Sequence, residues 1–154
     1  PSIAAFALLR PIFGLSLVTA VIPLTTYTLL ILVRNNHDGF KSVSPDILEA
    51  AEGMGYSRWE RLRRIELPLA VPLMIAGIRL ALVTTIGLAT VASILGDSFG
   101  GLGQFIKEGL QTFFPTKIYV GALLSVALAF GADFLIIRAE RRLTPWAVAR
   151  AARV

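Results

Sequence analysis

Residues 67–96 read LPLAVPLMIAGIRLALVTTIGLATVASILG, a stretch whose only charged residue is Arg79. A helix rises about 1.5 Å per residue, so about 20 mostly apolar residues cross the roughly 30 Å hydrocarbon core of a bilayer. Two further blocks are similar: residues 12–33 carry no charge, and residues 118–137 carry only Asp133. We therefore predict membrane helices over 12–33, 69–96 and 118–137, in an all-α polytopic membrane fold.

The composition of the whole chain supports a membrane location. Of its 154 residues, 55% are hydrophobic and 16% are charged, and the mean hydropathy is +0.72. Soluble domains are about 25% charged, so this balance excludes a disordered chain and an ordinary cytosolic enzyme. Helices buried in a large soluble core are the alternative, but three long apolar blocks in so short a chain favour the membrane.

Lysine and arginine gather on the cytoplasmic side of membrane proteins, which makes their positions informative about orientation. The connector between the first two blocks and the segment over 138–154 are both basic, whereas residues 97–117 hold only Lys107 and Lys117. We therefore predict a cytoplasmic connector, an extracytoplasmic loop over 97–117, and a cytoplasmic tail over 138–154 that includes the C-terminus. This distribution explains the net charge of +5 and the pI of about 10.2 without a nucleic-acid partner.

Residue types suited to catalysis or metal binding are scarce. The chain has no cysteine, and His37 has neither a second histidine nor spaced carboxylates beside it. We therefore predict no catalytic residue, no metal site and no cofactor. We expect no signal peptide at the start of the chain, and residues 3–9 look like the last turns of a helix. We accordingly expect the C-terminal portion of a longer protein, truncated at its N-terminus.

The connector contains the most specific local pattern, over residues 44–68. Ser44 and Pro45 suit the N-cap and first position of a helix, and Ile47, Ala51 and Met54 recur at the spacing of one apolar helix face. This pattern predicts a short amphipathic helix.

A second short helix is predicted directly after the first. Gly55 suits the left-handed position that ends a helix, and Ser57 and Glu60 have capping-box spacing. An apolar stripe then lies beside a basic stripe that includes Arg61, and residues 66–68 close the unit and lead into the second predicted span. The connector is thus two amphipathic helices joined by a tight turn. The alternatives are a helix pair lying on the lipid surface and a docking element for a soluble partner, which we favour.

The connector resembles the EAA loop of permease subunits in ATP-binding-cassette importers. The match runs through every fixed position of that loop: Glu49, Ala50 and Ala51, then Gly55, then Ile65, Leu67 and Pro68. The resemblance implies a type I importer transmembrane domain, in which this loop inserts into a groove of the ATPase subunit. There the two alanines would permit close approach, the carboxylate would meet donors in the groove, and the glycine would permit the reversal.

The resemblance also implies partners and a location. No Walker A sequence occurs in the chain, so we expect ATP hydrolysis on a separate ATPase subunit and predict that this chain is not an enzyme. A second permease subunit, identical or homologous, and an extracytoplasmic solute-binding protein are the other implied partners. The implied location is the plasma or inner membrane of the cell.

Further segments look like permeases for glycine betaine, carnitine, choline and related osmoprotectants, over nearly all of the chain. The segments are residues 1–4 (PSIA), 34–35, 49–79, 85–87 (TIG), 100–103 (GGLG) and 140–145 (ERRLTP). The loop over 96–103 is longer and more charged than the family pattern, through Asp97. The resemblance implies quaternary-amine osmoprotectants as cargo, and another small solute, such as an amino acid, remains open.

Aromatic residues near the predicted extracytoplasmic side have two interpretations. Quaternary ammonium ligands bind aromatic cages through cation–π attraction, whereas an aromatic belt marks the membrane interface. We favour the belt. The residues concerned are Phe99, Phe105, Phe113, Phe114 and Tyr119.

Two charges fall inside the predicted spans, Arg79 and Asp133. An intramembrane charge costs roughly 3 kcal/mol on insertion scales and usually marks pairing or function. Both lie toward the cytoplasmic half, and we expect them to pair or to line one inner vestibule. An ion-gradient-driven transporter or channel that uses them is the alternative class of function, but it leaves the EAA pattern unexplained.

Small and hydroxyl residues also occur in the second predicted span. Thr90 and Ser93 could face a polar pathway, although such residues more often pack membrane helices together. For the same reason Gly87 and Gly96 indicate close helix contacts.

Overall fold

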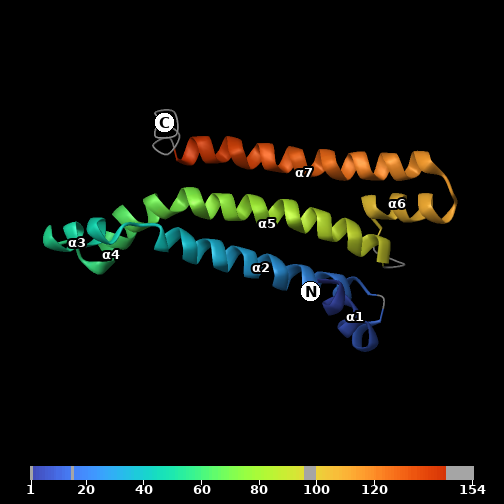
Figure 1. Cartoon of the computed structure of the whole chain (residues 1–154), viewed down its shortest axis with the longest axis horizontal. Coiled ribbons are helices and arrows are strands. Elements are labelled where there is room, and N and C mark those ends of the chain that lie inside the picture. The colour runs from blue at the N-terminus through green and yellow to red at the C-terminus, as the bar shows by residue number, and fades with distance from the viewer. Residues whose placement is uncertain (1, 15, 96–99, 145–154) are drawn as a thin grey trace. The chain divides into compact units, whose positions relative to one another are not determined.

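The computed structural model describes residues 2–14, 16–95 and 100–144, and every element assigned within them is helical (Figure 1). Three helices are long and apolar enough to cross a membrane: Leu17–Lys41, Arg58–Ile94 and Pro115–Arg142. The predicted all-α fold with three membrane-length helices is therefore confirmed. The elements are α1 (Ser2–Phe13), α2 (Leu17–Lys41), α3 (Pro45–Gly53), α4 (Arg58–Arg61), η1 (Leu62–Glu66), α5 (Leu67–Leu95), α6 (Leu102–Gln111) and α7 (Pro115–Leu143).

The helix ends differ from the ends of the apolar blocks. The first block was predicted to begin at residue 12, but Gly14 takes a left-handed φ of 64° and separates α1 from α2. At its other end α2 continues through Arg34 to Lys41, and the Asn35 amide donates to the Ile31 carbonyl at 2.8 Å. Helices α2 and α7 both run beyond the predicted spans because backbone hydrogen bonding does not stop where hydrophobicity stops.

The segment predicted as an extracytoplasmic loop, residues 97–117, contains the ten-residue helix α6. Gly100 and Gly101 have φ values of 64° and 80°, which glycine adopts without steric penalty, and the helix begins directly after them. Residues 96–99, with Asp97 and Phe99, lie outside the described residues, as do Pro1 and the predicted tail from residue 145 onward.

The chain divides into two compact units. One comprises Pro1–Leu30 and Ala81–Asp133, and the other comprises Ile31–Leu80 and Phe134–Val154. Helices α2, α5 and α7 each contribute residues to both units.

In the first unit, glycines bring α6 into close contact with α5 and α7. A Cβ atom built on Gly103 would lie 2.4 Å from the Thr90 carbonyl oxygen, and one on Gly121 would lie 2.9 Å from the Leu102 carbonyl oxygen. No side chain fits in those spaces, so the backbones approach as in small-residue membrane helix packing. Gly87 is different: no heavy atom lies within 4 Å of its built Cβ, so the predicted close contact there is wrong. Gly96 lies outside the described residues.

In the second unit, α2 packs on α5 in the same manner. A Cβ atom on Gly77 would lie 2.3 Å from the Asn35 Cβ, and one on Gly39 would lie 3.2 Å from the Ala70 carbonyl oxygen. Residues later in α2 therefore meet residues earlier in α5, which makes these two segments antiparallel.

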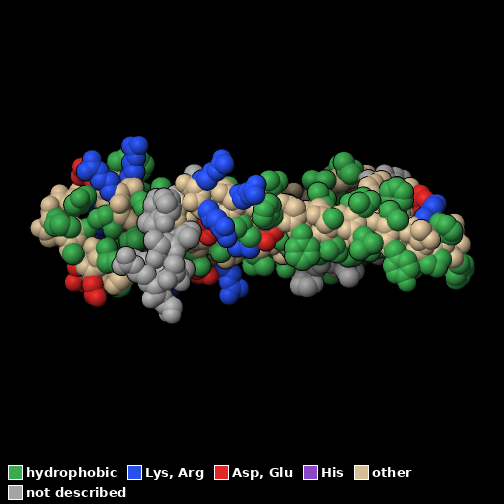
Figure 2. All heavy atoms as spheres, turned by 90° about the horizontal axis from the view of Figure 1, so that it is seen from above, with side chains coloured by type: hydrophobic (Ala, Val, Ile, Leu, Met, Phe, Trp, Pro, Cys, Tyr) green, Lys and Arg blue, Asp and Glu red, His purple; other side chains and the backbone are tan. Residues whose placement is uncertain are grey.

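The interior of the described chain is small, and most large apolar side chains are exposed. Hydrophobic side chains cover much of the visible surface in Figure 2. Such a surface is poorly suited to water, whereas lipid tails are as apolar as leucine and helix interfaces in membranes favour small residues. The buried hydrophobic residues are Ala20, Val43, Ala51, Ala70, Ile75, Ala81 and Ala92.

An ion pair joins α6 to α7 and should respond to pH. The Lys117 ammonium donates to Glu108 at 3.1 Å, and Gln104 donates to the same carboxylate. These bonds, Lys117 first, lower the pKa of Glu108 from its ordinary value of 4.5. The stabilisation is therefore fully present above pH 4.5 and is lost as the pH falls through the lowered pKa.

We expect the thermal unfolding midpoint in detergent to fall more steeply with acidification in the native chain than in a Glu108→Gln variant. Equal slopes for the two proteins would contradict a contribution from this pair.

Candidate functional site

The elbow, residues 44–68, begins as its sequence predicts. Ser44 has an extended backbone (φ −60°, ψ 135°), Pro45 is the first helical residue, and Asp46 lies in the first turn. The Ser44 side chain makes no capping hydrogen bond. The start of α3 therefore rests on the fixed φ of proline and on the acidic residue at the positive end of the helix dipole.

The turn after α3 is a Schellman motif. Gly55 has a φ of 81°, its N–H donates to the Glu52 carbonyl at 2.9 Å, and the Tyr56 N–H donates to the Ala51 carbonyl at 3.1 Å. These two bonds satisfy carbonyls that the helix end leaves free. The predicted left-handed conformation at Gly55 is confirmed.

The next helix starts with the predicted capping box. The Glu60 N–H donates to the Ser57 hydroxyl at 3.3 Å, and the Ser57 N–H donates back to the Glu60 carboxylate at 3.1 Å. Two backbone donors at the start of α4 are thus satisfied by one residue pair.

Arg61 joins the two arms of the elbow, which are α3 and the helix formed by α4 and η1. The sequence pattern did not reveal this role. The Arg61 Nη1 donates to the Glu52 carboxylate at the end of α3, and its Nε donates to the Glu66 carboxylate at 2.8 Å. The side chains of Arg61 and Glu66 are 21% and 18% exposed, so water screens this pair less than a surface pair. The sequence predicts a basic stripe here, and Arg61, which belongs to it, links the Glu52 and Glu66 carboxylates.

The second arm runs into α5 without a break. Residues Leu62–Glu66 form a π turn, in which the Leu67 N–H donates to the Leu62 carbonyl five residues earlier. Pro68 explains the wider turn, because proline has no N–H for the carbonyl of residue 64 and its ring collides with that carbonyl in a regular α-helix. Residues 66–68 were predicted to close the elbow and lead into the second span, and they continue its helix directly into that span.

Exposure separates the EAA residues into two groups. Glu49 and Ala50 are exposed, whereas Ala51 is completely buried. The methyl group of Ala51 therefore packs within this chain instead of facing outward. Of the residues at the other end of the motif, Leu67 is exposed and Ile65 and Pro68 are half-buried.

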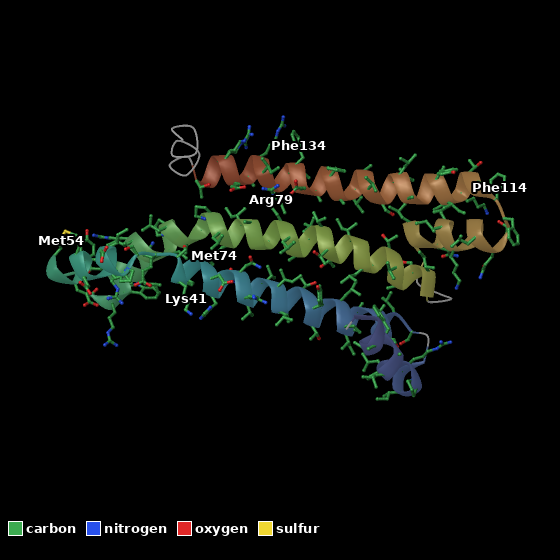
Figure 3. All side chains as sticks on the ribbon, viewed as in Figure 1. Lys41, Met54, Met74, Arg79, Phe114 and Phe134 are labelled. Carbon is green, nitrogen blue, oxygen red and sulfur yellow. The ribbon has the colours of Figure 1, made fainter. Side chains whose placement is uncertain are left out.

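Four large apolar side chains are exposed on the elbow. Ile47 and Leu67 are 42% and 38% exposed, and Met54 and Trp59 are 68% and 69% exposed. Met54 lies at the surface beyond the last turn of α3 (Figure 3). The elbow thus presents several carboxylates, including that of Glu49, and several apolar groups on a frame fixed by two caps and an arginine bridge. Exposed apolar groups on a rigid frame are typical of a surface that binds another protein.

An Arg61→Gln variant should loosen the elbow, because both carboxylates lose a charged partner. Amide exchange over α3 and α4 should become several times faster if the two arms open together. Arg63→Gln is the matched control, since Arg63 is exposed on the π turn that directly follows Arg61. Similar exchange rates for the two variants would show that the bridge is not structural.

The charged residues predicted inside the spans lie in different units. In the second unit the Arg79 Nη1 lies 3.9 Å from the Glu140 Oε2, and both side chains are half-buried. Glu140 was not among the residues predicted to form an intramembrane pair. Asp133 belongs to the first unit, and its pairing with Arg79 stays a prediction. Arg138 stacks over the Phe134 ring, 4.6 Å from its centroid.

Exchanging the charges of Arg79 and Glu140 tests whether the two side chains attract each other or only lie near each other. Each single change, Arg79→Glu or Glu140→Arg, places like charges together and should lower stability by about 1 kcal/mol. The double variant should recover at least half of that loss in a thermal unfolding assay. No recovery would mean that the two side chains do not interact.

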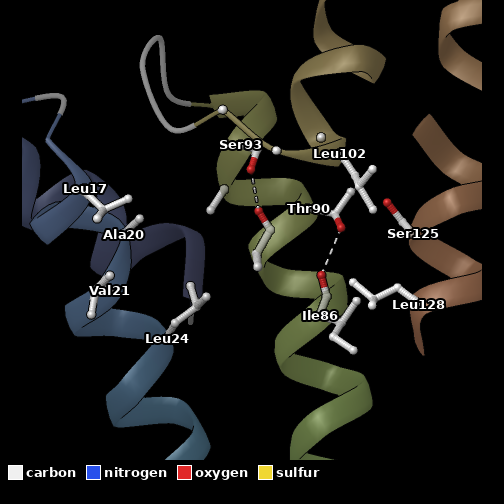
Figure 4. A pocket seen from close by; sticks show the side chains of 15 residues that line it. Leu17, Ala20, Val21, Leu24, Ile86, Thr90, Ser93, Leu102, Ser125 and Leu128 are labelled. Atoms are coloured by element: carbon white, nitrogen blue, oxygen red, sulfur yellow. Dashed lines mark hydrogen bonds between the residues drawn. The ribbon is translucent and has the colours of Figure 1, made fainter. Parts of the chain in front are cut away.

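A cavity of about 450 Å³ lies in the first unit (Figure 4). Thr90, Ser93 and Ser125 line it, but each hydroxyl donates to a carbonyl of its own helix, at 2.8–2.9 Å. The lining contains neither an aromatic nor a charged side chain. It therefore lacks the groups that bind a quaternary ammonium ion by cation–π attraction. Within the described ranges, no group of three histidine, cysteine or acidic residues could hold a metal ion.

The comparisons with known proteins agree with this architecture. Residues 1–145 match the family described as binding-protein-dependent transport system inner membrane component. The chain is 39% identical over 145 residues to the glycine betaine/carnitine/choline transport system permease protein OpuCB of Bacillus subtilis, covering 94% of this chain and 66% of that protein. It is 40% identical to the choline transport system permease protein OpuBB of the same organism, with the same coverage.

A relative from a second organism extends the comparison. The osmoprotectant import permease protein OsmW of Salmonella typhimurium is 38% identical over 150 residues, which is 94% of this chain and 69% of that protein. The chain spans about two thirds of the length of the curated relatives it matches. The fold defines a multi-pass helical membrane protein. More particularly, the chain belongs to the family of inner membrane components of binding-protein-dependent transport systems, and the predicted resemblance to osmoprotectant permeases is confirmed.

Proposed function

We propose that this chain is the permease subunit of an ATP-driven importer, and that the elbow docks on a partner ATPase subunit. The single observation that supports this most is the exposure of Glu49, Ala50 and Met54 on a rigid elbow that carries the EAA pattern. Small and apolar side chains permit close contact, and the carboxylate of Glu49 can accept hydrogen bonds from donors in a groove.

The continuity of the helix supplies a mechanism for coupling. Force applied to the elbow passes through α4 and η1 into α5, because residues Arg58–Ile94 form one continuous helical element. The Arg61 bridge keeps α3 aligned with that element. When two ATPase subunits close on ATP, each docked elbow moves as a unit and tilts the span that follows it. Hydrolysis then releases the elbows, and the spans return.

The cargo we propose is a quaternary-amine osmoprotectant. The support is similarity to relatives whose names specify glycine betaine, carnitine and choline. Two permease subunits would enclose the path, and an extracytoplasmic binding protein would deliver the solute. We also propose that the connector and the C-terminus are cytoplasmic, which the basic residues of the connector support through the positive-inside rule.

Site-specific crosslinking tests the docking. The chain has no cysteine, so Ala50→Cys and Ala51→Cys each introduce one thiol, the first at an exposed position and the second at a buried one. In intact membranes that contain the partner ATPase, a short bifunctional reagent should trap it through residue 50 and not through residue 51. Failure to trap the ATPase through residue 50, or equal trapping through both, would refute the docking.

Uptake by the purified complex in vesicles tests the cargo. Labelled choline should enter only when ATP is present on the side of the membrane that carries the ATPase subunits. Unlabelled glycine betaine or carnitine should compete with the labelled choline for uptake. Competition by amino acids alone would assign another solute without affecting the docking result.

A further inference from the structure

The corner between α6 and α7 has an unusual backbone. The Phe114 N–H donates to the Gly109 carbonyl at 2.9 Å, and the Thr112 N–H donates to the Glu108 carbonyl at 2.9 Å. Between them Phe113 has a φ of 53°, the one non-glycine residue with positive φ among the residues that the structure describes. Glycine normally occupies this position after a helix because a Cβ atom is unfavourable there.

The side chain held in this conformation points away from the protein. Phe113 is 92% exposed, and its neighbours Phe114, Leu110 and Tyr119 are 50%, 54% and 67% exposed. Figure 3 shows Phe114 at the same corner. A bulky residue in a strained conformation that is almost fully exposed suggests a role outside the chain.

The corner itself is firmly built. A Cβ atom on Gly109 would lie 2.6 Å from an Ile118 side-chain atom, so the end of α6 lies directly against the start of α7. The Glu108–Lys117 ion pair closes the same junction. The four apolar side chains are thus displayed on a fixed frame.

The surroundings of the corner favour lipid as the partner. It immediately precedes the membrane-length helix Pro115–Arg142. From the corner onward, exposed apolar residues follow one side of α7 at spacings of four, three and four: Tyr119, Leu123, Val126 and Phe130. In an inner membrane protein, an exposed strip of this composition suits acyl chains. The corner is the end of that strip, where aromatic side chains gather at a membrane interface.

Helix α6 divides its apolar residues between the chain interior and the surface. Ile106 lies against Gly121 of α7 and is half-buried, whereas Phe105 and Leu110 are 45% and 54% exposed. The polar residues fall on the other side of the helix: Gln104, Lys107, Glu108 and Gln111. The exposed pair adds apolar surface beside the corner.

We propose that this corner binds the membrane surface, with Phe113 inserted at the boundary between lipid headgroups and acyl chains. The insertion fixes the depth of the first turn of α7 in the bilayer. The proposal depends on membership of an inner membrane family and not on the cargo or on the ATPase contact.

Depth-dependent fluorescence quenching tests the insertion in the assembled transporter. Trp59 and Trp146 are first replaced by phenylalanine, and Phe113→Trp is then introduced as the reporter. In vesicles of phosphatidylcholine and phosphatidylglycerol, lipids brominated near the headgroup should quench its emission at least twofold, and more strongly than lipids brominated near the chain ends. Gln111→Trp, on the polar side of α6, is the matched control and should be quenched weakly.

Three results would overturn the proposal: no quenching by either lipid, equal quenching of both reporters, or shielding of the Phe113→Trp reporter only after the solute-binding protein or a second permease copy is added. The last result would assign the corner to a protein interface.

A second variant separates anchoring from folding. Phe113→Gly removes the side chain and relieves the backbone, so the chain should remain folded in detergent. In vesicles, a thiol introduced by Tyr119→Cys should then react with a water-soluble maleimide several times faster than the same thiol in a chain that keeps Phe113. In detergent the thiol should react at the same rate with and without Phe113→Gly. An increase of the same size in detergent would show a purely structural role.

Discussion

ATP-dependent uptake by a Gly55→Val variant should fall at least tenfold, whereas a Gly53→Ala variant should transport normally. Neither glycine has a heavy atom within 4 Å of a built Cβ, but Gly55 has a φ of 81° and Gly53 ends a regular helix. A side chain in the left-handed region costs about 1–2 kcal/mol, and more for a β-branched residue. The Schellman turn would therefore open, and the exposed end of α3 would lose its fixed direction.

Amide exchange in the elbow gives a readout that does not depend on transport. The Gly55→Val variant should exchange faster over α3, and Gly53→Ala should exchange no faster than the native chain, because alanine is the better helix former. Normal uptake by Gly55→Val would mean that the turn does not need its left-handed residue. Lost uptake with unchanged exchange would place the effect in the partner interface.

A Gly103→Ala substitution should lower the free energy of unfolding by about 2 kcal/mol, because the added methyl group would lie 2.4 Å from the Thr90 carbonyl oxygen and 2.6 Å from the Ser93 Cβ. Backbone atoms cannot move aside as a flexible side chain can, so the helices must separate. For a chain of this size, the thermal unfolding midpoint should fall by roughly 4–8 °C.

Gly87→Ala is the control in the same unit, because open space surrounds its built Cβ. It should leave the midpoint unchanged or raise it slightly through the higher helix propensity of alanine. Equal losses in the two variants would show that helix flexibility, and not close approach of α5 and α6, determines the outcome.

Local signals in the sequence predicted much of the elbow. Gly55 and the Ser57–Glu60 pair act within a few residues of themselves, so their spacing alone predicted a left-handed turn and a capping box, and both are present. The membrane helices were predictable because bilayer thickness sets a minimum apolar length. Their ends were not, because a helix continues into polar sequence until a residue such as Gly14 stops it.

Features that depend on more distant contacts were missed. Arg61 was one of several arginines at helical spacing, and only the fold brings Glu52 and Glu66 to the same guanidinium. The role of Gly103 depends on how closely α5 lies to it, which no local pattern records. Helix α6 left a signal that could have been found, in the recurrence of Leu102 and Ile106 after a pair of glycines.

The π turn Leu62–Glu66 sets the direction in which the elbow faces. A π turn holds one residue more than the α-helix it interrupts, and each helical residue rotates the chain by about 100° and advances it by about 1.5 Å. Deleting one residue there would swing α3 about a third of the way around the axis of α5 while leaving every EAA side chain unchanged. The direction in which the elbow faces around the α5 axis is therefore set by the number of residues in this turn, so an insertion or deletion there would redirect it.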